Sequence, residues 1–237
     1  MKKLSAIALA GALLSGLGLI QPGVSSAATV CAGPMGPGIV SGTLTVAGGN
    51  CVLVPGTIVT GSIKLSSGSL TMTGATVRGS ITQTGGTLVA QNSTIEGSVK
   101  VTGVASGSRN DICGGSIGGS VTVKGVGGDP SGWFRLLGTG AVAPVTPCTA
   151  PFSALKVKGS VSFTDNNIYV RVSRATVGGS VKLSGNTSNV YDLPNPNSGD
   201  VSFNTIGGSL KCDGNNPDPS GSGNVVSGSK KGECAAF

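Results

Sequence analysis

Apolar residues alternate with small polar residues along most of the chain. Two consecutive segments carry apolar side chains at matching offsets: Ile63, Leu65, Leu70, Met72, Ala75 and Val77, then Ile81, Leu88, Ala90 and Ile95. Side chains two residues apart lie on the same face of a β-strand, so this spacing predicts short strands with one buried face. The intervening Thr, Val, Ser and Gly residues are weak helix formers, which argues against a helical alternative.

A five-residue motif marks the repeat: an apolar residue, any residue, Gly, Ser or Thr, and a second apolar residue. Eight copies occur, at Val40–Leu44, Val59–Ile63, Val77–Ile81, Ile95–Val99, Ile117–Val121, Val157–Val161, Val177–Val181 and Ile206–Leu210. A degenerate ninth copy, Val226–Lys230, has lysine at its last position. The motif glycines are 19, 18, 18, 22, 40, 20, 29 and 20 residues apart.

This periodicity predicts an all-β fold: a single-stranded parallel β-helix, or solenoid, with about 8–9 coils of about 18–20 residues. One coil cannot bury its own apolar face and must stack on its neighbours. A β-sandwich is the alternative, but its strands should not repeat one motif so regularly. Glycine, at 42 of 237 residues, supplies the positive φ or the close approach that a tight corner requires.

The first 27 residues have the organisation of a secretory signal peptide. Met1-Lys2-Lys3 is basic, an apolar run follows from Leu4 to Ile20, and small residues precede a cleavage point after Ala27. We therefore expect residues 28–237 to form the mature β-helix domain, secreted to the extracellular space or the cell surface. No later apolar run approaches ~18 residues, so no transmembrane segment is expected.

Six cysteines follow the signal peptide: Cys31, Cys51, Cys113, Cys148, Cys212 and Cys234. An even count in an exported chain indicates disulfides, and six cysteines allow 15 connectivities. Their order favours neighbours, which pairs Cys31 with Cys51, Cys113 with Cys148, and Cys212 with Cys234. Each bridge would stabilise the fold by about 3 kcal/mol. No zinc-like CxxC spacing accompanies them, so no metal site is expected.

The repeat is interrupted between Gly119 and Gly159, which leaves one coil with an insertion or two coils. Four prolines and the single tryptophan favour an insertion over residues 125–151. Trp133 belongs to its aromatic and apolar cluster, which would form either a lid over the solenoid or a binding element. Residues 212–237 are rich in Gly, Pro and Asn and are expected to form a C-terminal cap.

Several cations fall at regular offsets in this scheme. The third residue after each motif glycine points outward and forms one column: Lys64, Thr82, Lys100, Thr122, Ser162, Lys182 and Lys211. Lys64, Lys100, Lys182 and Lys211 are therefore candidate contacts for an anionic wall polymer or polysaccharide. Charge placed on a sheet face only for solubility is the competing interpretation.

Composition limits the chemistry. Histidine is absent, which excludes a Ser-His-Asp triad and any His-bearing zinc site. The few aromatic residues argue against specific nucleic-acid binding, because base stacking requires flat rings. The best constellation of charged groups is Asp165-Asn166-Asn167 with Arg171 and Arg174 in the same coil, so both arginines join the candidate binding residues. No cofactor is indicated.

The Ile/Val-x-Gly-Ser-Ile/Val unit, from Val40 to Leu210, resembles the coil repeat of bactofilin-like, polymer-forming β-helix proteins. The resemblance implies a right-handed solenoid able to self-associate. The export signal and six cysteines depart from that family, and the chain looks more like an exported bacterial relative in architecture. The degenerate, disulfide-bearing C-terminal segment argues against end-to-end filament growth, so a monomer or weak self-association is expected. No functional residue carries over.

Together these observations favour a non-catalytic surface protein with a structural, adhesive or polymer-binding role. A polysaccharide lyase or glycoside hydrolase is the alternative, because such enzymes use this scaffold with paired carboxylates or an arginine or lysine base. Ice binding is a third possibility. It requires a regular Thr-x-Thr array, and the copies at Thr43-Leu44-Thr45, Thr71-Met72-Thr73 and Thr82-Gln83-Thr84 do not continue in register.

Overall fold

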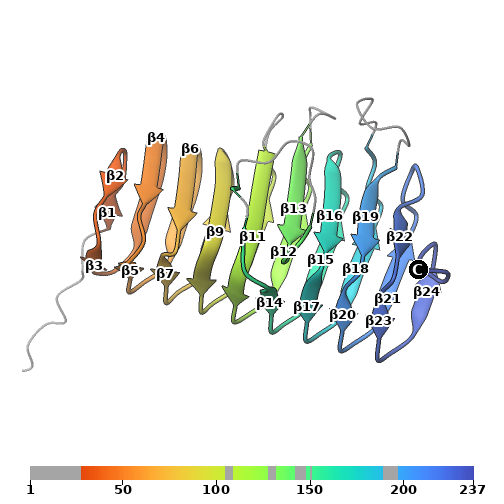
Figure 1. Cartoon of the computed structure of the whole chain (residues 1–237). Coiled ribbons are helices and arrows are strands. Elements are labelled where there is room, and N and C mark those ends of the chain that lie inside the picture. The colour runs from red at the N-terminus through yellow and green to blue at the C-terminus, as the bar shows by residue number, and fades with distance from the viewer. Residues whose placement is uncertain (1–27, 105–108, 128–131, 142–147, 150, 189–196) are drawn as a thin grey trace, which may run out of the picture.

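A computed structural model describes residues 28–104, 109–127, 132–141, 148–149, 151–188 and 197–237. These residues form 24 strands and no helix, and all strand pairs are parallel. The strands stack into an elongated solenoid of about nine turns, with the N-terminal strands at one end and the C-terminal strands at the other (Figure 1). The predicted parallel β-helix is confirmed.

Each coil turns through three faces. Face 1 contains the start of β4 (Leu44–Leu53) and of β6 (Ile63–Thr73), together with β1 (Thr29–Val30), β8 (Ile81–Gln83), β10 (Val99–Thr102), β12 (Val121–Lys124), β15 (Val161–Thr164), β18 (Val181–Ser184), β21 (Leu210–Asp213) and β24 (Lys230–Gly232). Face 2 contains the ends of β4 and β6, the start of β9 (Thr87–Ile95) and of β11 (Arg109–Ile117), and β2 (Pro34–Met35), β13 (Trp133–Leu137), β16 (Tyr169–Ser173), β19 (Gly199–Ser202) and β22 (Ser220–Ser222). Face 3 contains the ends of β9 and β11, and β3 (Gly38–Val40), β5 (Thr57–Val59), β7 (Thr76–Val77), β14 (Leu155–Val157), β17 (Ala175–Val177), β20 (Thr205–Ile206) and β23 (Val225–Val226).

The core is a set of aligned apolar columns. One column on face 1 consists of Leu44, Ile63, Ile81, Val99, Val121, Val161, Val181 and Leu210, which pair in register and are fully buried. Two aromatic rings also lie in the interior: Phe134 and Phe163 are fully buried and pack with their centroids 6.0 Å apart. The period-two pattern therefore assigned the inward positions correctly.

The motif glycine is required for close approach of successive coils. A Cβ on Gly79 would lie 2.5 Å from Ser62 Oγ and 2.7 Å from the carbonyl carbon of Gly61, and its φ is not positive. The serine that follows continues the corner, because Ser80 N donates to Ser62 Oγ at 3.1 Å and Ser98 N donates to Ser80 Oγ at 3.0 Å. The same contact recurs at every later motif copy.

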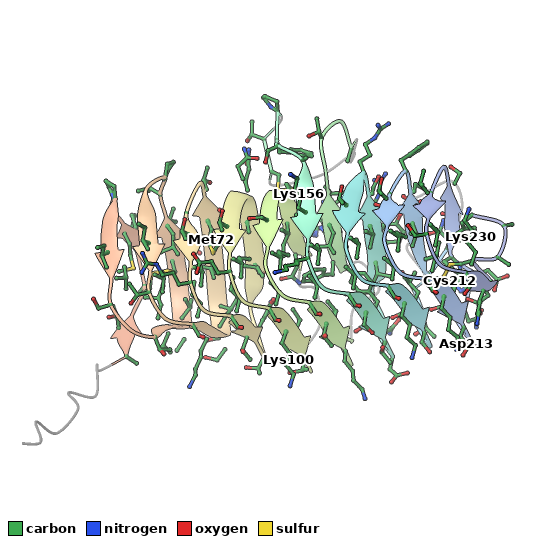
Figure 2. The ribbon with its side chains drawn as sticks, turned by 90° about the horizontal axis from the view of Figure 1, so that it is seen from below. Met72, Lys100, Lys156, Cys212, Asp213 and Lys230 are labelled. Atoms are coloured by element: carbon green, nitrogen blue, oxygen red, sulfur yellow. A yellow bond between two sulfur atoms is a disulfide. The ribbon has the colours of Figure 1, made fainter. Side chains whose placement is uncertain are left out.

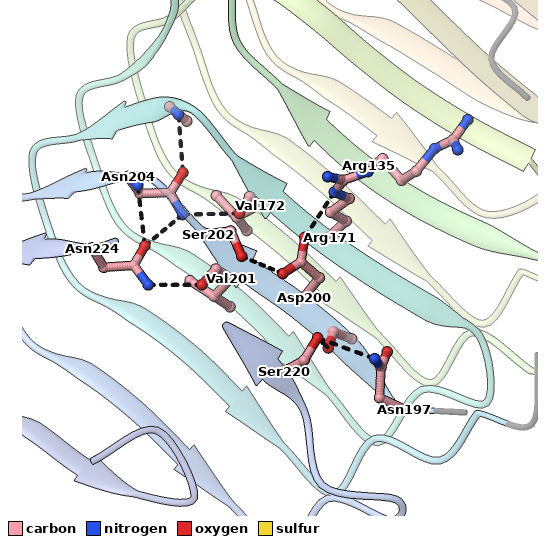
Figure 3. A network of polar contacts seen from close by, with 12 residues as sticks. Arg135, Arg171, Val172, Asn197, Asp200, Val201, Ser202, Asn204, Ser220 and Asn224 are labelled. Atoms are coloured by element: carbon pink, nitrogen blue, oxygen red, sulfur yellow. Dashed lines mark hydrogen bonds and ion pairs between the residues drawn. The ribbon is translucent and has the colours of Figure 1, made fainter. Parts of the chain in front are cut away.

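Buried asparagines connect the coils at the corner between faces 1 and 2. Asn166, Asn186 and Asn215 stack, and each side-chain amide donates to the next asparagine or to a backbone carbonyl of the previous coil. Glu233 ends the ladder by accepting from the backbone N and the Nδ2 of Asn215 at 3.0 and 2.6 Å. A second ladder joins Asn204 and Asn224 at the corner between faces 2 and 3 (Figure 3).

The long spacing from Gly119 to Gly159 is one coil. It contains β12, β13 and β14, and β13 pairs with β11 on one side and β16 on the other. The predicted insertion over residues 125–151 is therefore wrong for Trp133–Leu137, because this segment is part of the wall. Phe152, beyond β13, packs with Cys148 against Val89, Cys113 and Leu137 on the outside of face 2.

The predicted C-terminal cap, residues 212–237, is also corrected. β22, β23 and β24 pair with the preceding coil, so the stack continues almost to the C-terminus. Only the last residues cover the end: Cys234 is buried in the core, and Phe237 packs against it. Lys230 takes an inward position opposite Leu210 and donates to the backbone oxygen of Phe237.

All three predicted disulfides are present: Cys31–Cys51, Cys113–Cys148 and Cys212–Cys234. Their environments differ. The first and third lie inside the solenoid, one near each end, where their sulfurs are part of the main core. The second lies outside the solenoid on face 2 and holds Cys148 against the wall.

Candidate functional site

The predicted lysine column is in register on face 1. Strand pairing places Lys64, Thr82, Lys100, Thr122, Ser162, Lys182, Lys211 and Lys231 side by side in successive coils. At ~4.8 Å per coil, the column is about 34 Å long. In Figure 2 the side chain of Met72 points into the interior, whereas Lys100 projects away from the ribbon.

Face 1 carries the net charge of the molecule. Its outward positions hold six lysines, Lys64, Lys100, Lys124, Lys182, Lys211 and Lys231, and one acid, Asp213, which gives +5. The formal charge of the whole chain is +7, and Lys2 and Lys3 account for two of those charges. The remaining eight basic and eight acidic residues beyond position 27 therefore cancel.

The side chains between the lysines are short and hydroxylated. Thr82, Thr122 and Ser162 occupy the intervening places in the column, and the lysines themselves are exposed. Lys211 Nζ lies 3.7 Å from Asp213 Oδ2, with both side chains at least half exposed. An ion pair this exposed contributes little, so it leaves Lys211 available to another anion.

Face 2 carries a second row of polar side chains, and its charged groups are paired with one another. Asp111, Arg135, Arg171 and Asp200 pair in register on β11, β13, β16 and β19. Arg135 donates to both oxygens of Asp111, at 2.7 and 3.1 Å, and Arg171 Nε lies 2.9 Å from Asp200. Figure 3 shows Ser202 on the other side of Asp200, to which it donates a hydrogen bond.

Trp133 is part of this row. Its Nε1 donates to Asp111 Oδ2 at 3.1 Å, and the guanidinium carbons of Arg109 and Arg135 lie 4.6 and 4.3 Å from its ring centroid. These contacts engage the ring in cation–π interactions with the protein itself. Trp133, a candidate binding residue in the sequence, therefore offers no open aromatic surface to a ligand.

Tyr169 lies beside Trp133 in the next coil. Burial raises the pKa of Tyr169 to about 12, and the charge of Asp200 acts in the same direction, whereas Arg171 and Arg135 oppose it. The phenol is therefore neutral at physiological pH.

The charged constellation predicted around Asp165 takes a different form. Asp165 occupies a corner with φ 53°, and Arg171 is paired with Asp200. Arg174, also at positive φ, lies with its guanidinium carbon 5.0 Å from the centroid of Phe203. Arg171 and Arg174 are thus held by neighbouring coils on face 2 and at its edge.

The arrangement does not form a glycosidase pair on face 2. Asp111 and Asp200 are three coils apart, or about 14 Å, beyond the ~9.5 Å that separates the carboxyl groups of an inverting glycosidase. Asp111 is fully buried, and both of its oxygens accept hydrogen bonds from the protein. A general acid or base must reach a substrate proton, which Asp111 cannot do in this geometry.

The threonine pairs considered for ice binding are distributed over different faces. Thr82 lies on face 1, whereas Thr71 lies on face 2. They therefore build no common flat array. Among the described residues, no group of His, Cys, Asp or Glu side chains has the arrangement of a metal site.

Comparison with known proteins returned no match to a protein-family model, a curated protein or a solved structure. The described residues also contain no helix long and apolar enough to cross a membrane. The class defined by fold and surface is a disulfide-containing parallel β-solenoid with one basic face.

Sequence reasoning missed two lysines of face 1 and, apart from naming Arg171 as a candidate, the ion pairs of face 2. Lys231 follows the rule used for the other lysines, being third after Gly228, but the stack was expected to end before it. Lys124 lies two residues beyond Thr122 and also points outward. The pairing of Asp111 with Arg135 depends on the register across the 40-residue coil, which the motif spacing does not provide.

Proposed function

We propose that this chain is a secreted, non-catalytic protein that binds an anionic polymer along face 1, in a structural or adhesive role at the cell surface. The observation that carries the proposal is the concentration of the net charge on one face, with hydroxyl groups between the lysines. An extended polyanion laid along the solenoid axis would contact several coils at once, so that weak contacts add.

Three further observations support this proposal. The basic start and apolar run of residues 1–20 are typical of exported chains, and disulfides persist in oxidising compartments. The resemblance of the Gly-Ser repeat to bactofilin-like proteins supports a scaffold role.

Binding to immobilised poly(glycerol phosphate) tests the proposal. The triple variant Lys64→Ser, Lys100→Ser, Lys182→Ser removes three exposed cations from face 1. The control variant Arg78→Ser, Lys156→Ser, Lys158→Ser removes three exposed cations from positions outside face 1, so both variants have the same net charge.

We expect the slope of log binding constant against log salt concentration to fall by about 2 in the face 1 variant and to change less in the control, because each lysine displaces counterions. Equal losses in both variants would mean that only net charge matters. Wild-type protein that does not bind, or a face 1 variant that binds as wild type does, would refute the proposal.

A further inference from the structure

A groove of about 510 Å³ crosses the outside of face 3. It extends over four successive coils, from the end of β9 through β11 and β14 to β17. Its outward side chains are Thr94, Ser116, Lys156 and Thr176, which pair in register, and Glu96 and Lys158 lie along its edge. At ~4.8 Å per coil, this column is about 14 Å long.

Glycine shapes one side of the groove. Gly118 and Gly178 lie on either side of Lys158 in the corner column, and a Cβ at either position would collide with the backbone oxygen of the preceding coil. No larger residue fits there without moving the coil. The surface beside Lys158 is therefore bare backbone, and the groove is lined mainly by carbon, to which lysine methylenes can contribute.

The charge in the groove is unevenly distributed. Lys156, in β14, and Lys158, the first residue after β14, are both exposed and lie two residues apart, about 7 Å from each other. Glu96 lies two coils from Lys158 in the corner column, about 10 Å away. The β14 part of the groove therefore presents two cations beside a carbon-lined surface.

We infer that the face 3 groove binds a short acidic saccharide, with carboxylates at Lys156 and Lys158 and the C–H faces of the sugar rings on the carbon-lined surface. An acidic saccharide has both features that the groove complements, a flat C–H face for the carbon-lined surface and carboxylates for Lys156 and Lys158. A phosphate chain has no C–H face of this kind. This site lies on a different face from the lysine column and does not depend on the function proposed for that column.

Calorimetric titration with trigalacturonate tests the inference. The variant Lys156→Ser, Lys158→Ser removes the cations, and Ser116→Tyr fills the middle of the groove. Arg78→Ser, Arg109→Ser removes two exposed cations that belong neither to the groove nor to the face 1 column, and it is the charge-matched control. Maltotriose and tripolyphosphate are the comparison ligands, one with rings and no charge, the other with charge and no rings.

We expect trigalacturonate to bind the wild type, and to bind the Lys156/Lys158 variant about tenfold more weakly. Ser116→Tyr should weaken binding as well, provided that its circular dichroism and thermal transition match the wild type; otherwise the lysine variant alone decides. The Arg78/Arg109 variant should bind normally. No binding to the wild type, equal loss in the Arg78/Arg109 control, or tripolyphosphate binding at least as tightly as trigalacturonate would each overturn the inference.

Discussion

Replacing Asn186 by alanine tests whether the buried asparagine ladder holds the coils together. Asn186 is fully buried. Its Nδ2 donates to Phe163 O at 3.1 Å and to Asn215 Oδ1 at 2.9 Å, and its Oδ1 accepts from Asn166 N and Nδ2 at 3.3 and 2.8 Å. Alanine removes all four contacts without changing the backbone.

The cost follows from the buried group that loses its partner at this site. Asn166 Nδ2 keeps Val123 O, and Asn215 Oδ1 keeps the backbone N of Asn186. Asn166 N loses the only acceptor described for it, whereas Phe163 O loses one donor and stays within the paired strands β15 and β18. One buried backbone group at about 1–3 kcal/mol, with a small cavity, gives an expected loss of about 2–4 kcal/mol.

Urea unfolding followed by circular dichroism measures this loss, and amide hydrogen exchange at Asn166 shows whether it is local. The control is Asn167→Ala: Asn167 is exposed, and its Oδ1 accepts only a 3.5 Å contact from Thr187 among the hydrogen bonds described. That change should stay within about 0.5 kcal/mol. If Asn186→Ala costs no more than Asn167→Ala, the ladder is not a source of stability and the reasoning fails.

Three further predictions concern the corner, the outer disulfide and the buried phenol. Gly79→Ala should destabilise the fold by about 1–3 kcal/mol through overpacking against the previous coil, whereas Gly36→Ala, where a Cβ meets nothing within 4 Å, should be close to neutral in thermal unfolding. Replacing both Cys113 and Cys148 by serine should increase binding of an apolar dye, because the bridge holds the outer apolar cluster against face 2; unchanged dye binding would show that packing alone holds it. Tyr169 should titrate near pH 12 in an ultraviolet titration of the Tyr191→Phe protein. Because its folded pKa is raised above the ordinary 10.0, Tyr169 contributes stability that is complete below about pH 10 and is lost as the pH rises to about 12; a tyrosine titrating at 10 would contradict this.

The sequence predicted the fold well because two independent periods agreed. Alternation assigned inward residues such as Leu65 and Leu70, and the Gly-Ser motif placed one corner of every coil. The structure explains why the motif is so regular: the glycine leaves space for the backbone of the previous coil, and the serine accepts its neighbour's amide. Both residues are required locally, so the corner can be recognised without knowledge of distant contacts.

The predictions of an insertion and of a C-terminal cap failed. In both regions the loops between the strands differ from those of the other coils, but the strands still pair in register with their neighbours. Between Gly119 and Gly159 the wall strand β13 has no glycine marker, and its apolar residues Phe134 and Leu136 resembled a separate cluster. Near the C-terminus, the prolines and glycines after Asp213 suggested an end to the stack. Short strands such as β22 and β23 need only two or three paired residues, so these turn-forming residues were accommodated between them.

The lysine column was predictable because each lysine depends only on its offset from the corner glycine. Its charge distribution bears on the proposed anionic partner. Lys182, Lys211 and Lys231 occupy three successive coils in register, and like charges directly opposite on neighbouring strands are destabilising. A face that served only solubility would mix both signs, as a stable surface does. Face 2 shows that this chain can place opposite charges on neighbouring coils, since Arg135 follows Asp111 and Asp200 follows Arg171. The arrangement of the face 1 lysines therefore supports the proposed binding of an anionic polymer.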